Sequence, residues 1–449
     1  MKLYPYQEDG VDFLVRTRRA LLADEMGLGK TAQAITALQR TSRRSILVVC
    51  PKTPKSVWHD EFKKWWPGIE VVDVGGTVRQ RARLWATPAQ VHLVNYEALH
   101  RDINEIHQRW DAVVVDESHR AKNRRSQTYQ ALARITRHTP YVFLLTGTPI
   151  MRAPQDLWAQ LKLLQPTRTP GYWSFVRQYC DVYWSGYTWT VGELLDAPGL
   201  SAYLTPLVLH RTKELLGDQL PPLTVQQIWL DLPPAHRKLY QRMHRELFMR
   251  TGPGPEDYIA ALTIGARTTF LRLAATHPSL VSARYVDPLT GPKVGACFDI
   301  IQDRTDRGVV IFSAFSRVIR RVTSALIQNG IPCETLHKDL PSAARMELIR
   351  RFQSGDLRVL LSTVALGGVG LTLTSADLVV ALDKDWVPAN NDQAYSRLHR
   401  IGQTRPVTAV ELLARDTIDE RIHELCLGRT AEARAALRST NTTHRYLQG

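Results

Sequence analysis

Short runs of valine, isoleucine and leucine alternate with segments of helical spacing over roughly the first 150 residues. Between the runs, segments such as Ser56–Trp66 place their apolar residues at helical spacing. Near-continuous apolar strands that alternate with helices are typical of a parallel sheet covered on both faces. The pattern therefore predicts an α/β lobe with strands at Ile46–Cys50, Glu70–Val74, Val91–Asn95, Ala112–Asp116 and Tyr141–Thr146.

The same alternation returns from about residue 293, with helical patterns at Arg317–Gln328 and Ala343–Phe352. It predicts a second parallel sheet, so the expected fold class is α/β with two such lobes. The strands expected in the second lobe are Val309–Ser313, Cys333–His337, Arg358–Ser362, Leu378–Leu382 and Val407–Leu413.

The segment between the lobes has a different character. It is rich in tryptophan, tyrosine, leucine and proline, and we predict it to be mostly helical with loops. The expected domains are an N-terminal lobe (residues 1–165), a helical insertion and linker region (166–290), a C-terminal lobe (291–430) and a C-terminal tail (431–449).

The excess of basic residues bears on the kind of partner that the protein binds. Lysine and arginine total 58 against 43 acidic residues, which gives a formal net charge of +15. Such an excess favours a polyanionic partner, because basic side chains neutralise phosphates and release counterions. The alternative is a solvated basic surface without a partner.

Cysteine use and hydropathy bear on the compartment. The five cysteines are scattered without a paired Cys-x-x-Cys spacing, which argues against a zinc site or a disulfide framework. The first residues lack an apolar signal region, and no apolar run is long enough to span a membrane. We therefore expect a protein of the cytoplasm (nucleoid-associated) or of the nucleus, neither secreted nor membrane-bound.

The stretch Ala20–Thr36 carries the strongest chemical signal. An apolar strand end is followed by a loop with Gly27 and Gly29, and a helical pattern then begins at Lys30. Glycines let backbone N–H groups surround phosphate oxygens, and the helix N-terminus adds to the attraction. Lys30 can reach the β- and γ-phosphates, and the Thr31 hydroxyl can bind Mg²⁺.

Two observations keep an alternative open for this stretch. A glycine turn between a strand and a helix occurs in many α/β proteins without any ligand. The usual phosphate-loop pattern also has a glycine at the position where this chain has Asp24. The other motifs must decide between the two interpretations.

Asp116 and Glu117 follow the apolar strand Ala112–Val115 directly. Functional groups of open α/β sheets gather at the carboxyl ends of the strands. Asp116 suits coordination of the Mg²⁺ that Thr31 binds, and Glu117 suits the base that deprotonates an attacking water. Acidic residues that merely end a strand are the alternative.

Two arginines mark a second chemical stretch late in the chain. Residues 390–400 are predicted as a helix, which would place Arg397 and Arg400 on one face. Two guanidinium groups there could neutralise charge on a transferring phosphoryl group. Two solvated arginines on an amphipathic helix are the alternative.

Together these stretches resemble the Swi/Snf-type ATPase family of helicase superfamily two, and the match covers residues 3 to about 425. The matching motifs are LYPYQ (3–7), DEMGLGKT (24–31), DESH (116–119), LTGTPI (145–150), LHRTKELLGDQLPP (209–222), IFSAFS (311–316) and RLHRIGQ (397–403). The DEMGLGKT form of the phosphate loop accounts for Asp24 as part of the nucleotide site.

The resemblance implies two RecA-like lobes with helical insertions and with ATP and Mg²⁺ bound between them. It makes Gln7 the purine contact and Tyr4 a ring neighbour of the nucleotide. Lys30 and Glu117 would act with Arg397 and Arg400 of the second lobe as catalytic residues.

The resemblance also implies a DNA-stimulated ATPase that moves along double-stranded DNA as a translocase or remodeller. Polar groups at strand ends would bind the sugar-phosphate backbone without reading sequence. The candidates are Lys52, Asn95, Ser313, Ser316 and Thr363. We expect a monomer that can have protein partners for targeting.

Some stretches depart from the usual family form. Ser362–Leu373 is one residue longer and ends in Leu-Thr-Leu, and Leu336-His337-Lys338 lacks the glycine often found there. The DESH wording favours the distal branch that resembles annealing helicases. Two rival functions stay open, a strand-separating DNA or RNA helicase of the same superfamily and a catalytically inactive DNA-binding scaffold.

Overall fold

The computed structural model describes residues 2–52, 55–151, 153–245, 248–250, 258–260, 264–284, 291–304, 307–367 and 372–437. The chain divides into two compact units, which we call unit 1 (residues 1–217 and 429–449) and unit 2 (residues 218–428).

Unit 1 is built on a seven-stranded parallel sheet. Alternate residues of a strand point to opposite faces, so Leu47 and Val49 enter one hydrophobic core while Val48 and Cys50 enter the other. The strand order is β3 (Val71–Val74), β4 (Val91–Asn95), β2 (Ile46–Cys50), β5 (Ala112–Asp116), β6 (Tyr141–Leu145), β1 (Arg19–Leu22) and β9 (Val208–Leu209).

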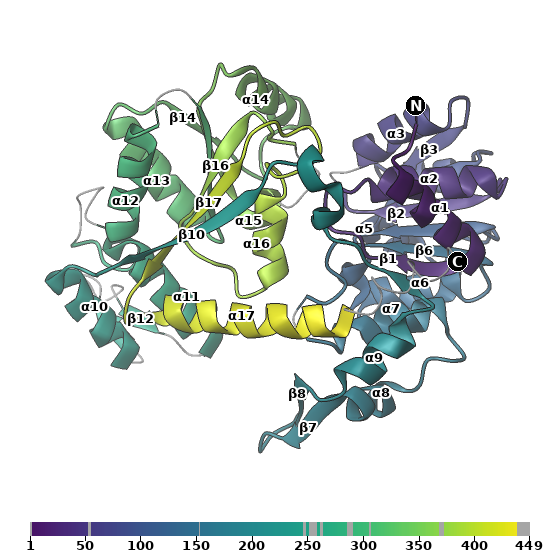
Figure 1. Ribbon diagram of the computed structural model, residues 1–449, viewed down its shortest axis with the longest axis horizontal. Coiled ribbons are helices and arrows are strands. Elements are labelled where there is room, and N and C mark those ends of the chain that lie inside the picture. The colour runs from purple at the N-terminus through teal and green to yellow at the C-terminus, as the bar shows by residue number, and fades with distance from the viewer. Residues whose placement is uncertain are drawn as a thin grey trace. The chain divides into compact units, whose positions relative to one another are not determined.

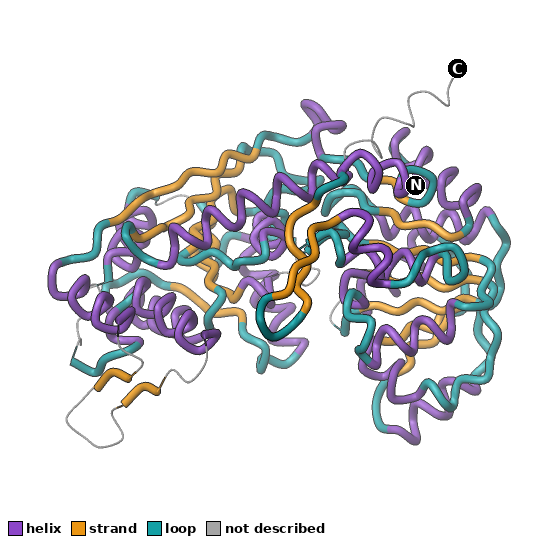
Figure 2. The backbone as a smooth tube through the Cα atoms, turned by 90° about the horizontal axis from the view of Figure 1, so that it is seen from below, coloured by secondary structure: helices purple, strands orange, loops and turns teal. Residues whose placement is uncertain are grey.

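Helices cover both faces of this sheet (Figures 1 and 2). One core takes residues from α1 (Pro5–Thr17), α2 (Lys30–Arg40) and α3 (Lys55–Trp65), and the other from α5 (Tyr96–Asp102), α6 (Gln127–Thr136) and α7 (Asp156–Leu164). The remaining elements are α4 (Val78–Ala86), η1 (Ser118–Ala121), α8 (Tyr172–Tyr179), β7 (Cys180–Trp184), β8 (Trp189–Leu194), α9 (Ala197–Leu204) and η2 (Lys213–Gln219).

Unit 2 has a six-stranded parallel sheet, again with a hydrophobic core on each face. Its strand order is β10 (Leu223–Leu230), β17 (Val407–Ala414), β16 (Ala376–Ala381), β13 (Gly308–Ser313), β15 (Val359–Thr363) and β14 (Cys333–Leu336). Its helices are α10 (Pro234–Arg245), α11 (Ile264–Thr276), η3 (Pro278–Leu280), α12 (Pro292–Gln302), α13 (Ser316–Gln328), α14 (Ser342–Ser354), α15 (Val364–Gly367), α16 (Pro388–Tyr395) and the first part of α17 (Ile418–Leu437). The short strands β11 (Phe248–Arg250) and β12 (Tyr258–Ala260) pair antiparallel.

The two parallel sheets confirm the predicted α/β fold class. The segment expected to be mostly helical contains strands as well, namely the hairpin β7–β8, the edge strand β9 and the edge strand β10. The hairpin carries half-exposed aromatic side chains such as Trp184 and Trp189, so its sequence lacks the apolar alternation of a buried strand. Residues 166–217 accordingly belong to unit 1, and residues 218–290 belong to unit 2.

Helix α17 runs through the predicted end of the C-terminal lobe. It continues to Leu437, and Ala436 and Leu437 are buried in a core of unit 1. The first residues of the expected tail (431–449) are therefore helical, and residues 438–449 lie outside the described part of the chain.

A buried ion pair ties α12 to α17 within unit 2. Lys293 is fully buried, with Nζ 2.5 Å from Asp419 Oδ2 and 2.9 Å from the carbonyl oxygen of Leu382. We expect Lys293→Met to lower the free energy of unfolding of unit 2 by about 3 kcal/mol, because Asp419 is left as a buried, unpaired charge.

Guanidinium unfolding followed by circular dichroism measures this effect. Arg350→Met is the matched control, since Arg350 pairs with Glu347 on the surface of α14, and it should leave the unfolding midpoint unchanged. Equal midpoints for Lys293→Met and the wild type would contradict the expected cost.

Candidate nucleotide site

A glycine loop joins β1 to α2 in unit 1. Gly27 and Gly29 have positive φ angles of 92° and 76°, which side chains with a Cβ rarely adopt. A Cβ on Gly29 would also lie 2.3 Å from Gln7 Nε2. The loop leads into the N-terminus of α2, which begins at Lys30. This is the strand–loop–helix form that binds anions through backbone N–H groups.

Lys30 is held against the loop that precedes it. Its Nζ donates to the carbonyl oxygens of Asp24 and Glu25, at 2.7 and 3.3 Å. Burial lowers the pKa of Lys30, while the acidic groups around it, Glu117 first among them, act in the opposite direction. Lys30 is therefore electrostatically coupled to the carboxyl end of β5, and Thr31 follows it as the second residue of α2.

The two carboxylates of the DESH motif lie at the carboxyl end of β5, as the sequence predicted. Asp116 accepts hydrogen bonds from Trp58 Nε1 at 2.9 Å and from the backbone N–H of Glu117 at 3.0 Å. Burial, followed by the neighbouring Glu117, raises the pKa of Asp116 to about 6. The set of a carboxylate and the Thr31 hydroxyl fits Mg²⁺, which prefers oxygen ligands and completes its shell with water and phosphate.

Glu117 has a backbone conformation that is unusual for a residue with a side chain, with φ 54° and ψ 49°. Such conformations persist where the surrounding structure enforces them, often at functional sites. Its Oε2 lies 3.4 Å from His119 Nδ1, and the same nitrogen lies 2.9 Å from Thr146 Oγ1. Burial lowers the pKa of His119 to about 3, so this imidazole is neutral near pH 7 and the contact with Glu117 is not an ion pair.

The N-terminal segment of the LYPYQ motif packs on the glycine loop. Gln7 accepts from the backbone N–H of Tyr4 at 3.0 Å and donates to the carbonyl oxygen of Leu28 at 3.2 Å. Gln7 is buried, whereas the ring of Tyr4 is partly exposed and stacks on Tyr6 with ring centroids 5.9 Å apart. The structure therefore brings Gln7, the predicted purine contact, to the phosphate loop, and Tyr4, the predicted ring neighbour, packs beside it on Tyr6.

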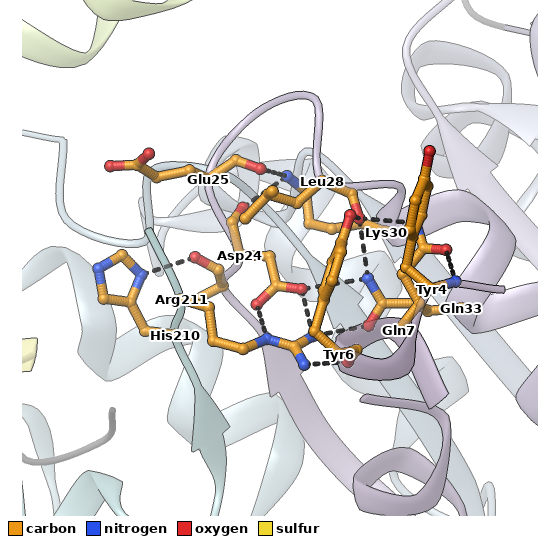
Figure 3. A network of polar contacts seen from close by, with 11 residues as sticks. Tyr4, Tyr6, Gln7, Asp24, Glu25, Leu28, Lys30, Gln33, His210 and Arg211 are labelled. Atoms are coloured by element: carbon orange, nitrogen blue, oxygen red, sulfur yellow. Dashed lines mark hydrogen bonds and ion pairs between the residues drawn. The ribbon is translucent and has the colours of Figure 1, made fainter. Parts of the chain in front are cut away.

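Asp24 turns its carboxylate away from the loop and into the protein (Figure 3). It is fully buried and accepts from Arg211 Nε and Nη2 at 2.8 and 2.5 Å, and from Gln33 Nε2 at 3.1 Å. Its place in the nucleotide site is thus structural, through the loop conformation and the carbonyl oxygen that binds Lys30. Sequence reasoning assigned no role to Arg211 or Gln33, although Arg211 lies inside the LHRTKELLGDQLPP motif.

The arginines of the RLHRIGQ motif lie in unit 2, but not on the helix that was predicted. Helix α16 ends at Tyr395, and the next residues form turns in which the N–H of Arg397 binds the carbonyl oxygen of Ala394. The prediction that Arg397 and Arg400 share one helical face is therefore wrong. Arg397 is mostly buried, and Arg400 Nη1 donates to Thr372 Oγ1 at 2.9 Å.

The predicted backbone-binding residues differ in their availability. All of these residues end a strand or closely follow one, and because both sheets are parallel they lie at the carboxyl edge of their own sheet. Lys52 and Ser316 are exposed, and Thr363 is partly buried. Asn95 caps α5, since its Oδ1 accepts from the N–H of Ala98 at 2.7 Å. Ser313 is fully buried and its hydroxyl donates to Asp383, so it positions a buried carboxylate and does not present its hydroxyl to solvent.

Among the residues that the structure describes, no group of three or more histidine, cysteine, aspartate or glutamate side chains is arranged to hold a metal ion. No helix in that part of the chain is long and apolar enough to cross a membrane.

Comparisons with known proteins agree with the motifs. The model of the SNF2-related domain matches residues 6–280, and that of the helicase conserved C-terminal domain matches residues 292–402. Chromodomain-helicase-DNA-binding protein 1-like of Danio rerio is 31% identical over 94% of this chain and 42% of its own length. DNA annealing helicase and endonuclease ZRANB3 of Mus musculus is 29% identical over 93% of this chain and 39% of its own length.

The chain thus spans about two fifths of the length of these curated relatives. A solved SWI2/SNF2 ATPase core of Sulfolobus solfataricus, in complex with double-stranded DNA, is 24% identical with a TM-score of 0.46 and covers 98% of this chain and 95% of that one. Because the match to the SNF2-related domain alone takes in more than half of the residues, the chain belongs to the SNF2-related family of helicase-like ATPases.

Proposed function

We propose that this protein hydrolyses ATP in response to double-stranded DNA and moves along the duplex as a translocase. The observation that carries the proposal is the glycine loop with Gly27 and Gly29 at positive φ, which leads into α2 at Lys30, while the acidic end of β5 at Asp116 and Glu117 acts electrostatically on that lysine. A lysine that can bind phosphates and a glutamate that can accept a proton from the attacking water are two of the groups that nucleotide hydrolases use for phosphoryl transfer.

Each side chain then has a role. The loop N–H groups and Lys30 bind the phosphates, and Glu117 accepts a proton from the attacking water. Thr31 and Asp116 would hold Mg²⁺, which supplies charge neutralisation on the phosphates when bound. Arg397 and Arg400 of unit 2 neutralise charge on the transferring phosphoryl group, Gln7 contacts the purine, and Tyr4 is a ring neighbour of the nucleotide.

The proposed partner is double-stranded DNA without sequence preference. The net charge of +15 and the exposed Lys52 and Ser316 at strand ends support binding to phosphates. The names of two relatives, a helicase-DNA-binding protein and a DNA annealing helicase, also refer to DNA. The protein would then act as a monomer in a compartment that holds DNA, the cytoplasm with its nucleoid or the nucleus, with protein partners for targeting.

The test is the ATPase rate of the full chain with duplex, single-stranded and forked DNA and with RNA. We expect duplex DNA to stimulate hydrolysis most, with a steep loss of DNA affinity as salt rises. No phosphate release with saturating duplex would favour the inactive scaffold. ATP-dependent displacement of a strand from a tailed duplex would favour the strand-separating helicase.

Glu117→Gln removes the proposed base and keeps the shape of the side chain. We expect turnover to fall by about two to four orders of magnitude while binding of a fluorescent ATP analogue is retained. Lys30→Ala, in contrast, should lose both turnover and analogue binding. Wild-type turnover in Glu117→Gln would show that another group accepts the proton.

The arginines give an independent test of unit 2. Arg397→Ala and Arg400→Ala should each lower turnover about 10³-fold or more while nucleotide affinity stays close to that of the wild type. Arg421→Ala is the control, because Arg421 pairs with Glu424 on the exposed side of α17. Unchanged turnover in both motif variants would remove these residues from the mechanism.

Asp116 makes stability depend on pH. Its folded pKa of about 6 lies above its ordinary 3.8, so between these values the folded state binds more protons and stability falls as pH rises. Asp116→Asn should therefore raise the free energy of unfolding by about 3 kcal/mol at pH 7.5, with no gain below pH 3.8. Thermal melting at several pH values measures this, and a gain that is independent of pH would contradict it.

A further inference from the structure

Arg211 contacts three segments of unit 1, all of which lie far from it in the sequence (Figure 3). Its Nε and Nη2 donate to the two carboxylate oxygens of Asp24 in the phosphate loop, and Nη2 also donates to Gln33 Oε1 of α2 at 2.8 Å. Its Nη1 donates to the carbonyl oxygen of Tyr6 in α1. A planar guanidinium can make this set of bonds at once, whereas an ammonium group cannot.

The backbone around Arg211 is also bound to the loop. The parallel pairing of β1 with β9 continues beyond both strands, because the N–H of Ala23 donates to the carbonyl oxygen of Leu209 and the N–H of Glu25 to that of Arg211, at 2.7 and 2.9 Å. The N–H of Lys213 then donates to the Glu25 carboxylate at 2.8 Å. The segment around Arg211 therefore runs alongside the start of the phosphate loop and is hydrogen-bonded to it at Ala23 and Glu25.

These contacts lead directly to Lys30. The carbonyl oxygens that accept from Lys30 Nζ belong to Asp24 and Glu25, the two loop residues that Arg211 and Lys213 bind. A change in the position of the loop at these residues would move the atoms that orient the ammonium group. Arg211 is thus connected to Lys30, the residue proposed to bind the phosphates, through one intervening residue, Asp24.

The network is closely packed on its other side. A Cβ on Gly10 would lie 1.8 Å from Gln33 Oε1 and 2.7 Å from Arg211 Nη2. The guanidinium also lies over the ring of Tyr6, 5.4 Å from its centroid, and the Tyr6 hydroxyl donates to the carbonyl oxygen of Leu28 at 3.2 Å. The loop is consequently fixed relative to α1, which carries the predicted purine contacts.

We propose that Arg211 is a positioning residue for the nucleotide, which holds the phosphate loop and the purine-contact segment in one geometry through Asp24, Gln33 and Tyr6. The inference rests on the proposed ATPase function. It assigns to the LHRTKELLGDQLPP segment a part in the nucleotide site of unit 1, although Arg211 lies 187 residues after Asp24 in the chain.

The test separates positioning from stability. Arg211→Met leaves Asp24 buried and unpaired, so both the melting temperature and the apparent affinity for ATP should fall. In the double variant Asp24→Asn with Arg211→Met no buried charge remains, and the new amide can bond to Gln33. We expect the melting temperature to recover in the double variant while KM for ATP stays raised by about tenfold or more.

A second buried arginine–aspartate pair of unit 1 provides the matched control. Arg81 Nε and Nη2 donate to the carboxylate of Asp102 at 2.7 and 2.8 Å, and both residues are buried. The pair joins α4 to α5, which contact β3 and β4 at the edge of the sheet opposite β1 and β9. Arg81→Met should lower the melting temperature as Arg211→Met does and leave KM for ATP within about twofold of the wild type.

Two results would overturn the inference. One is a double variant whose KM for ATP returns to the wild-type value together with its melting temperature. The other is an equal rise in KM for Arg81→Met, which would mean that lost stability alone explains the effect.

Failure of the ATPase proposal looks different from failure of this one. If the wild type hydrolyses no ATP, or Lys30→Ala equals the wild type, both proposals fail together. If the wild type is active, Lys30→Ala is inactive and the Arg211 double variant has a normal KM, only the positioning role fails.

Discussion

A buried carboxylate directly before the glycine loop is the constraint on which this part of unit 1 depends. Asp24 is fully buried with its carboxylate turned into the protein, where a negative charge is unfavourable unless a positive group neutralises it. Arg211 neutralises the Asp24 carboxylate through two hydrogen bonds, and residues 207–213 lie alongside the loop in the same arrangement. The edge of the sheet, the glycine loop and the start of α1 are therefore parts of one polar network.

The acidic end of β5 shows a related balance of charges. Burial raises the pKa of Asp116 and lowers that of Lys30, and each group limits the shift of the other. His119 stays neutral near pH 7, so it adds no positive charge beside Glu117. A site with this balance is suited to accept a polyphosphate together with a divalent cation. The phosphates would neutralise the positive charge of Lys30, and the cation would neutralise the carboxylates at the end of β5.

Much of this could be predicted from the sequence, where the signal is local. The glycine loop before a helix at Lys30 and the end of an apolar strand at Asp116 were both predicted, and α2 and β5 have these bounds. The end of α16 at Tyr395 could not be predicted, because residues 396–401 contain no glycine or proline and the first such residue is Gly402. Ser313 was expected to face a ligand, but its partner Asp383 comes seventy residues later in the chain and only the fold brings them together. Arg211 and Asp24 are an even more distant pair, and no local pattern reports such a contact.

The order in which the chain is made gives α17 a further significance. Unit 2 is inserted within unit 1 in sequence, and residues 429–437 return to complete a core of unit 1 with Ala436 and Leu437. During synthesis on the ribosome, unit 2 can bury its own two cores before these residues exist, whereas unit 1 must wait for them. Until residues 429–437 are made, the apolar surface of unit 1 that Ala436 and Leu437 later cover would stay exposed on the nascent protein.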